Sequence, residues 1–369
     1  MLKSDNVYGL LDKCSGKFWN CKKLLTFSRP WNFVTGSRSV GKSTNIAIFF
    51  ILDFLKNDHK FIYCRRTKDE TLLTCNTFFG NAVPIINKCT EYNITNFEYN
   101  GGEYYIELDG DEAPRQCGKV VPLSLEQKYK SSNFSEYCNL VYDEFICQDS
   151  TRYLGSKDTP DREYRAVISL YQTIDRGIDR PYRNETRFFF LGNTATIYNP
   201  IFLSLNISDY ITDEKARFIR PKSQLWILER IESVEATSEI ENSFAFMLSD
   251  EIGRDYAYRN KGADSDEYIK PVPEHARTYI HTLKFKGRSY GLYRSLDNFA
   301  YYIGTPLDIG SSTIALDNES HTETDLKLVT TWSEHPLIMS MIKAYKQNKL
   351  FFANGRIKSA FYIYFNLTP

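Results

Sequence analysis

Apolar residues follow two different spacings along the first part of the chain. Short apolar runs of strand length occur at residues 31–36, 60–66, 138–145 and 187–193. Between these runs, apolar side chains recur at helical spacing over residues 43–57 and 162–180. Residues 102–108 alternate between apolar and polar side chains, as expected for a strand of a partly exposed sheet. Strands that alternate with helices predict an α/β fold with a mostly parallel sheet.

The pattern changes from Ile211 onward. Residues 216–231 contain two further strands, and a helix that starts near residue 238 leads into a charged, proline-containing stretch. Three strands then follow within residues 277–304, joined by tight turns at Lys286-Gly287 and Asp297-Asn298, and a helix covers residues 333–348. We therefore predict a first domain at residues 1–234, a helical linker at 235–270 and a small C-terminal α/β domain at 271–369.

Composition adds two constraints. Lys and Arg balance Asp and Glu at 46 each, yet residues 1–66 hold twelve basic against four acidic side chains. Such a distribution is compatible with basic faces for nucleic acid and equally with a solvated surface. The eight cysteines are irregularly spaced, which predicts reduced, mostly buried thiols. Because no apolar run reaches membrane-spanning length and the N-terminus lacks a secretion signal, we expect a soluble cytoplasmic protein with no membrane partner.

A phosphate-binding motif lies between the first strand and the first long helix. The residues from Gly36 to Ser43 match GxxxxGK[ST] in the strand–loop–helix context that the motif requires. Loop N–H groups and the helix dipole favour the β-phosphate, the Lys42 charge suits the β- and γ-oxygens, and the Ser43 hydroxyl can ligate Mg²⁺. The alternative is a glycine-rich turn without a ligand. We predict that ATP contacts Gly36, Ser37, Arg38, Ser39, Val40, Gly41, Lys42, Ser43 and Thr44.

Polar side chains end two further strands. Asp143 and Glu144 end the strand at 138–145, where Asp143 would hold Mg²⁺ through water and Glu144 would polarise the attacking water. A carboxylate base favours hydrolysis over phosphoryl transfer to a small molecule. In ATPases of the additional-strand, catalytic-glutamate type, a residue placed like Asn193 contacts the γ-phosphate or the water. The alternatives are acidic surface residues and a turn-forming asparagine.

Two basic clusters remain. Arg65, Arg66 and Lys68 follow the second strand and would reach the active site or a neighbouring subunit, unless they form a solvated turn. A second cluster follows the helix at 162–180 and would act on the γ-phosphate of an adjacent subunit in a ring; outside a ring its members are surface charges. This second cluster consists of Arg176, Arg180 and Arg183.

Several segments together resemble the genome-packaging ATPase of the small tailed bacteriophages typified by the Bacillus podoviruses, which package terminal-protein-capped DNA. The matching segments, in family order over residues 32–202, are NFVTGSRSVGKS, FIYCRRTK, VPLSLEQKYKSSNFSEYCNLVYDEFI, LYQTIDR and LGNTATIYNPIF. A weaker match follows at LFFANG, residues 350–355. The chain departs from the family in SRSV within the loop and in a longer segment from Gln148 to Glu163.

The resemblance implies a ring, a homopentamer, that uses ATP and Mg²⁺ to pump double-stranded DNA into an empty procapsid. Its implied partners are the portal (connector) protein and a structural packaging RNA. It would work in the host cytoplasm, transiently at the portal vertex, and be absent from the mature virion. Carried over by position, Lys42, Ser43, Asp143 and Glu144 match the phosphate, metal and catalytic groups. Arg176 matches the arginine that acts across the interface, and Arg65 and Lys68 match basic residues that approach a neighbour's nucleotide.

Related large packaging ATPases carry an RNase H-like nuclease at the C-terminus, with two metals held by clustered carboxylates. In this chain the first strand of that region, residues 277–286, has no Asp or Glu. Asp297 lies at a turn, and Asp308 and Asp317 lie in loops. We therefore predict a vestigial nuclease domain used for docking. The alternatives are a terminase-type motor with an active nuclease, a non-enzymatic vertex scaffold, and a helicase or other DNA pump.

Overall fold

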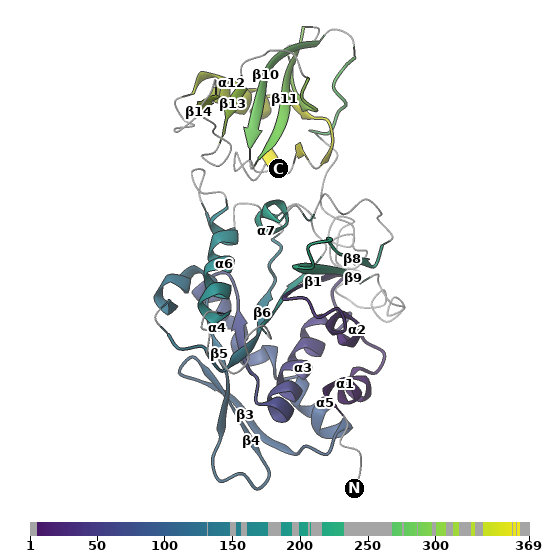
Figure 1. The fold of residues 1–369 in the computed structure, drawn as a ribbon, viewed down its shortest axis with the longest axis vertical. Helices are drawn as coiled ribbons and strands as arrows, with labels where there is room; N and C mark the ends of the chain where they lie inside the picture. The colour runs from purple at the N-terminus through teal and green to yellow at the C-terminus, as the bar shows by residue number, and fades with distance from the viewer. Residues whose placement is uncertain are drawn as a thin grey trace. The chain divides into compact units, whose positions relative to one another are not determined.

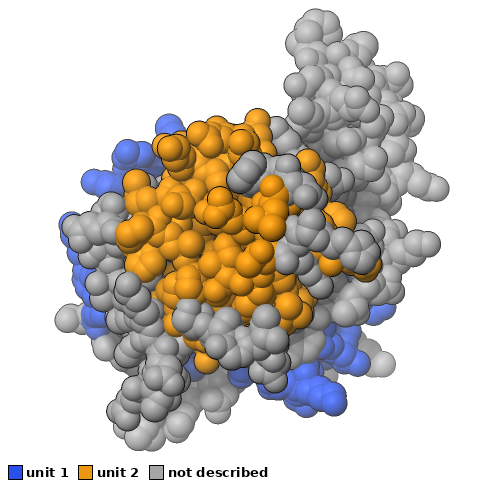
Figure 2. All heavy atoms as spheres, turned by 90° about the horizontal axis from the view of Figure 1, so that it is seen from above, with its two compact units in different colours: residues 1–148, 163–196, 209–263 blue, residues 149–162, 197–208, 264–369 orange. Residues whose placement is uncertain are grey.

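The described residues form two compact units. The computed structural model describes residues 6–130, 132–147, 153–155, 161–175, 186–193, 199–205, 207, 216–231, 268–274, 277–285, 287–296, 300–307, 313–316, 326–328, 335–355, 357–358 and 360–361. The first unit contains residues 1–148, 163–196 and 209–263, and the second contains 149–162, 197–208 and 264–369. Figure 2 colours the two units separately. The second unit includes two segments that the predicted domain of residues 1–234 also covers, so the predicted domain limits stay a prediction.

The first unit is built on a nine-stranded sheet in the order β3-β4-β5-β2-β6-β7-β1-β9-β8. Figure 1 draws this unit as a ribbon and labels several of its strands. All neighbours from β5 to β9 pair in parallel, while β3, β4 and β8 are antiparallel additions at the two edges. The mostly parallel sheet predicted from the sequence is therefore confirmed. The strands are β1 (Trp31–Gly36), β2 (Lys60–Cys64), β3 (Ile94–Asn100), β4 (Glu103–Leu108), β5 (Arg115–Val120), β6 (Tyr137–Asp143), β7 (Arg187–Gly192), β8 (Phe218–Ile219) and β9 (Trp226–Ile231).

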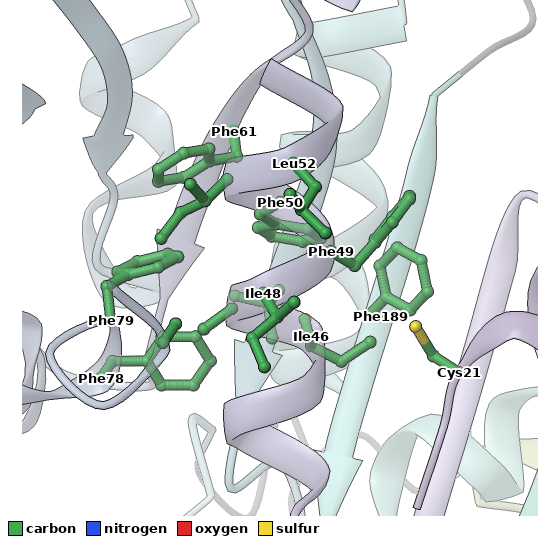
Figure 3. Close-up of a cluster of buried hydrophobic side chains, with 14 of the residues drawn as sticks. Cys21, Ile46, Ile48, Phe49, Phe50, Leu52, Phe61, Phe78, Phe79 and Phe189 are labelled. Carbon is green, nitrogen blue, oxygen red and sulfur yellow. The ribbon is translucent and has the colours of Figure 1, made fainter. Parts of the chain in front are cut away.

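Helices cover both faces of this sheet. On one face the buried helix α3 (Lys42–Asn57) places Phe50 against Phe61 of β2 and Phe189 of β7, at 5.6 Å between ring centroids in both pairs (Figure 3). On the other face Tyr171 of α6 (Arg162–Asp175) packs against Trp31 of β1. Strands covered on both sides have continuous apolar runs, which explains why these strands were predictable. The remaining helical segments are α1 (Val7–Ser15), α2 (Lys22–Leu25), α4 (Lys68–Phe78), α5 (Ala82–Cys89) and the 3₁₀ helix η1 (Leu123–Tyr129).

Strand β7 lies between the strand that precedes the phosphate-binding motif and the strand that ends in Asp143. Its register pairs Gly192 with Thr35 of β1 and Leu191 with Asp143 of β6. The carboxyl ends of the three strands therefore meet at one edge of the sheet, where open α/β sheets bind ligands. This order is the one expected of an ATPase with an additional strand between these two motifs.

The second unit contains a mixed six-stranded sheet in the order β14-β13-β10-β11-β12-β15. The three predicted strands are confirmed as an antiparallel meander from β10 to β12, and the predicted helix is α12 (Pro336–Lys346). The predicted helix near residue 238, the Asp297-Asn298 turn, Asp308 and Asp317 lie outside the described residues. The elements are α7 (Pro200–Ser204), β10 (Arg277–Phe285), β11 (Arg288–Ser295), β12 (Tyr301–Gly304), β13 (Thr313–Ala315), β14 (Leu326–Leu328) and β15 (Leu350–Phe352).

Two further expectations concern the thiols and the membrane. All eight cysteines are free, and every one except the half-buried Cys89 is buried, as the sequence predicted. Burial raises the pKa of the Cys14 thiol to about 12, so this group stays a neutral thiol. Among the described helices, none has the length and apolar character required to cross a bilayer.

Candidate functional site

The loop between β1 and α3 depends on the two glycines of its motif. Gly41 has a φ of +89°, in the left-handed region that side chains disfavour, and it directly precedes the first residue of α3. At Gly36, a Cβ atom would lie 2.9 Å from Cβ of Ile231 on the neighbouring strand β9. Both positions therefore require glycine. Between them Ser37 and Val40 are buried and Arg38 and Ser39 are exposed, and after them Ser43 and Thr44 are half-buried.

The Lys42 side chain folds back onto the phosphate-binding loop and donates to its carbonyl groups. Its ammonium donates to the carbonyl oxygens of Gly36 at 2.8 Å and Ser37 at 2.7 Å, and to Oδ1 of Asn193 at 3.3 Å. Burial lowers the pKa of Lys42 to about 8, while the nearby carboxylate of Asp143 opposes that shift. The lysine thus has polar partners in a buried position, and Asn193 is one of them. A contact of Asn193 with the γ-phosphate or the attacking water stays a prediction.

Ser43, at the end of the phosphate-binding motif, lies close to Asp143, at the end of β6. The Ser43 hydroxyl donates to Oδ1 of Asp143 at 3.5 Å. Burial raises the pKa of the Asp143 carboxyl, and the adjacent Arg65 guanidinium opposes that rise. A hydroxyl and a carboxylate are the hard oxygen ligands that Mg²⁺ uses, usually one or two from protein with the rest from water and phosphate. The described part of the chain holds no group of three or more His, Cys, Asp and Glu side chains suited to a metal.

Glu144 follows Asp143 in an unusual backbone conformation. Its φ is +55°, a left-handed value for a residue with a side chain, and the side chain is 54% exposed. The carboxylate lies 3.6 Å from the Arg65 guanidinium and lines the same cavity as Lys42. Immediately after it, the N–H of Phe145 donates to the carbonyl of Leu191 on β7. The turn therefore sends Glu144 toward the cavity while the chain stays attached to the sheet.

Arg65 lines the cavity formed by its own chain and contacts Asp143 there. Its Nη2 donates to Oδ2 of Asp143 at 2.9 Å, and its side chain is largely buried. Lys68, at the first position of α4, is exposed and does not line the cavity. The solvated-turn alternative is therefore wrong for Arg65. A role for Lys68 at a neighbouring subunit stays a prediction, and Arg176, Arg180 and Arg183 lie outside the described residues.

Arg66 forms a buried network that the sequence did not reveal. Its guanidinium donates to both carboxylate oxygens of Glu163, at 2.8 and 3.1 Å, and Glu163 also accepts from the Tyr142 hydroxyl at 2.7 Å. The same guanidinium donates to the carbonyl oxygens of Glu144 at 3.4 Å and Phe145 at 3.0 Å. Arg66 therefore holds the backbone turn that carries Glu144. Adjacent arginines after a strand were visible in the sequence, but their partners were not.

One cavity of about 620 Å³ is lined by the phosphate loop together with Arg65, Asp143, Glu144 and Asn193. Its phosphate-loop side contains the residues described above, and its other side is formed by the end of α1 and by α4 and α5. The lining residues are Cys14, Ser15, Phe18, Arg38, Ser39, Val40, Gly41, Lys42, Ser43, Thr44, Asn45, Ile48, Tyr63, Arg65, Thr74, Thr77, Phe78, Asn81, Ile85, Asp143, Glu144, Leu191, Gly192 and Asn193. A charged half beside a partly apolar half suits a ligand with a polyphosphate and a ring system.

Comparison with known proteins finds a matching family model and similar DNA packaging proteins of Bacillus phages. The Podovirus DNA encapsidation protein (Gp16) family model matches residues 11–368. The DNA packaging protein of Bacillus phage phi29 is 26% identical over 350 residues, covering 94% of this chain and 96% of that protein. The DNA packaging protein of Bacillus phage B103 is 25% identical over 345 residues, covering 92% and 97%.

A solved structure has a similar fold. The chain in the bacteriophage Phi-29 viral genome packaging motor assembly superposes with a TM-score of 0.67 at 24% sequence identity. The superposition covers 95% of this chain and 99% of that one. The similarity therefore extends over both units and is not confined to the phosphate-binding region.

Proposed function

Because this chain belongs to the Podovirus DNA encapsidation protein (Gp16) family, we propose that it is the ATP-driven motor that moves double-stranded viral DNA into a preformed procapsid through the portal vertex. The observation that carries the proposal is the meeting of Lys42, Ser43 and Asp143 at the carboxyl ends of the parallel strands β1 and β6, which flank β7. A phosphate loop, a buried carboxylate and a hydroxyl in this arrangement suit a Mg²⁺-bound nucleoside triphosphate.

In this proposal the loop holds the triphosphate and the neighbouring side chains orient it. N–H groups at the start of α3 point to the β-phosphate, and Lys42 exchanges its loop carbonyl partners for phosphate oxygens. Ser43 and Asp143 would hold Mg²⁺, which supplies charge neutralisation of the β- and γ-oxygens when it is bound. Arg65 favours the ionised form of the buried Asp143 carboxyl, since its guanidinium opposes the rise in the pKa of Asp143 that burial causes.

Glu144 is the proposed general base. Its exposed carboxylate lines the cavity beside Asp143, so it can accept a proton from a water placed beyond the γ-phosphate. Asn193 ends the strand between the two motifs and contacts Lys42 at 3.3 Å, which suits a residue that senses the γ-phosphate. The backbone turn that presents Glu144 is fixed by Arg66, so the base is positioned before the nucleotide arrives.

The proposed motor is a homopentameric ring that carries further groups between subunits. Arg176 would stabilise the transition state of the adjacent subunit, and Lys68 would approach the same nucleotide from its exposed place on α4. Double-stranded DNA, the portal (connector) protein and a structural packaging RNA are the proposed partners. We place the protein in the host cytoplasm, transiently at the portal vertex, and outside the mature virion.

The second unit is proposed to be a vestigial nuclease used for docking. Its meander of β10, β11 and β12, continued by parallel strands, is typical of an RNase H-like sheet. Strand β10 carries no Asp or Glu, and no metal-binding group of three His, Cys, Asp or Glu side chains is found in the described ranges. The lack of Asp and Glu in β10 supports a motor without nuclease activity over a terminase that cuts DNA, while Asp297, Asp308 and Asp317 lie outside the described residues.

The proposal is tested by ATP hydrolysis of the purified full chain, with and without linear double-stranded DNA. We expect Mg²⁺-dependent hydrolysis that DNA stimulates, and we expect Lys42→Ala to lose ATP binding while its circular dichroism spectrum is unchanged. Hydrolysis by Lys42→Ala at the parent rate would contradict the site. A parent protein that neither binds nor hydrolyses ATP would contradict the function.

A further inference from the structure

Phe18 is an exposed aromatic residue at the mouth of the cavity. Phe18 is 51% exposed. It nevertheless lines the cavity that contains the phosphate loop. A phenylalanine left open to water costs hydrophobic stabilisation that covering by a flat ligand would restore.

The backbone around Phe18 is attached firmly to the loop and to α3. The N–H of Trp19 donates to the carbonyl of Val40 at 3.0 Å. The Asn45 side chain donates to Oγ of Ser15 at 2.7 Å and accepts from the N–H of Cys21 at 2.9 Å. Because hydrogen bonds hold the chain on both sides of residue 18, the position of its Cα relative to the loop is fixed by the fold.

The Phe18 side chain lies against the last loop residue before α3. A Cβ atom on Gly41 would be 2.8 Å from Cβ of Phe18 and 3.4 Å from Cδ1 of its ring. The γ-phosphate end of the site is marked by Asp143 and Asn193, which end the neighbouring strands. The α-phosphate end of a bound triphosphate therefore lies toward Gly41 and the start of α3, where the ribose and the base continue.

We propose that Phe18 is the platform on which the base of the bound nucleotide stacks, so that the segment of residues 15–21 makes the site selective for nucleotides over bare polyphosphate. The inference rests on the proposed function, since it needs a nucleotide in the phosphate loop. Phe78 and Ile48 line the same cavity and give the base side further apolar surface. Stacking on an aromatic ring tolerates every base, because each base has a flat π-face.

The test measures the affinity of the full chain for Mg²⁺-ATP and for Mg²⁺-tripolyphosphate, which has no base, by titration calorimetry. Phe18→Ala should weaken ATP binding by about 5- to 150-fold, the range of one base–aromatic stack, and leave tripolyphosphate affinity within about twofold. Phe18→Trp should keep parent-like ATP affinity and add a fluorescence change on binding ATP that tripolyphosphate does not produce.

The matched control is Leu225→Ala. Leu225 is also an exposed apolar residue of the first unit, but it lies at the amino ends of the parallel strands, directly before β9, and does not line the cavity, so both affinities should be unchanged. Unchanged ATP affinity in Phe18→Ala would overturn the inference, as would an equal loss of both ligands, which would indicate damage to the loop. If the parent chain binds neither ligand, the proposed function itself fails.

Discussion

Replacing Arg66 by methionine removes the cation of the buried network next to the catalytic turn. The Arg66 and Glu163 side chains are 4% and 0% exposed, so the variant leaves a carboxylate buried without its cation. Breaking a buried ion pair in this way costs about 3–5 kcal/mol. The carbonyl oxygens of Glu144 and Phe145 also lose their donor. For a unit of this size, we expect the unfolding midpoint to fall by about 6–20 °C.

Tryptophan fluorescence is a suitable assay because three of the four tryptophans, Trp19, Trp31 and Trp226, belong to the first unit. The double variant Arg66→Met with Glu163→Gln should recover at least half of the lost stability, since the amide is neutral and still accepts from Tyr142. The control Arg115→Met, at a 44% exposed ion pair, should cost less than about 1 kcal/mol.

The same variant has a functional readout at temperatures below its unfolding midpoint. Because Arg66 holds the turn that carries Glu144, we expect kcat for ATP hydrolysis to fall while KM for ATP stays near the parent value. A single variant that loses less than about 1 kcal/mol would refute the reasoning about the buried pair. Loss of stability with an unchanged kcat would refute the positioning role.

Three further predictions concern the charged groups and the second unit. Arg65→Gln removes the cation that opposes the pKa rise of buried Asp143, so the variant should bind Mg²⁺-ATP more weakly than the parent, and its affinity should increase as pH rises. Calorimetry at several pH values measures this, and a pH-independent affinity equal to the parent's contradicts it. Arg176→Ala should be nearly inactive alone, with about 10³–10⁵ lost in rate, and its mixture with Glu144→Gln should recover part of the ATPase activity; full activity of Arg176→Ala alone rules the role out. The purified chain should not nick plasmid DNA with Mn²⁺, and cleavage that maps to residues 271–369 would show an active nuclease.

The central strands and the phosphate loop were predictable because local pattern determines them. Strand β7 contains three consecutive phenylalanines that are buried on both faces of the sheet, so its apolar run is unbroken. Strands β3 and β5 were not predicted. In β3 only Ile94 is fully buried, and β5 contains charged Arg115 and Lys119, so neither has an apolar run of strand length.

The sequence also did not predict which carboxylates pair with Arg65 and Arg66, because these partners are distant along the chain. Arg65 and Arg66 looked alike in the sequence, as neighbours that follow a strand. Their carboxylate partners are 78 and 97 positions away, at Asp143 and Glu163, and only the order of the strands brings them together. The left-handed backbone of Glu144 was equally hidden, because a glutamate at φ +55° depends on surrounding contacts and not on local preference.

The most direct test of the motor is DNA packaging itself, with purified chain, matching procapsids, genomic DNA and ATP, scored as DNA protected from nuclease. The parent chain should protect full-length DNA. Glu144→Gln should bind ATP with parent-like affinity and package at least about 10²-fold more slowly, because a general base contributes about 10² to 10⁴ in rate. Packaging by Glu144→Gln within about twofold of the parent rate would contradict the account.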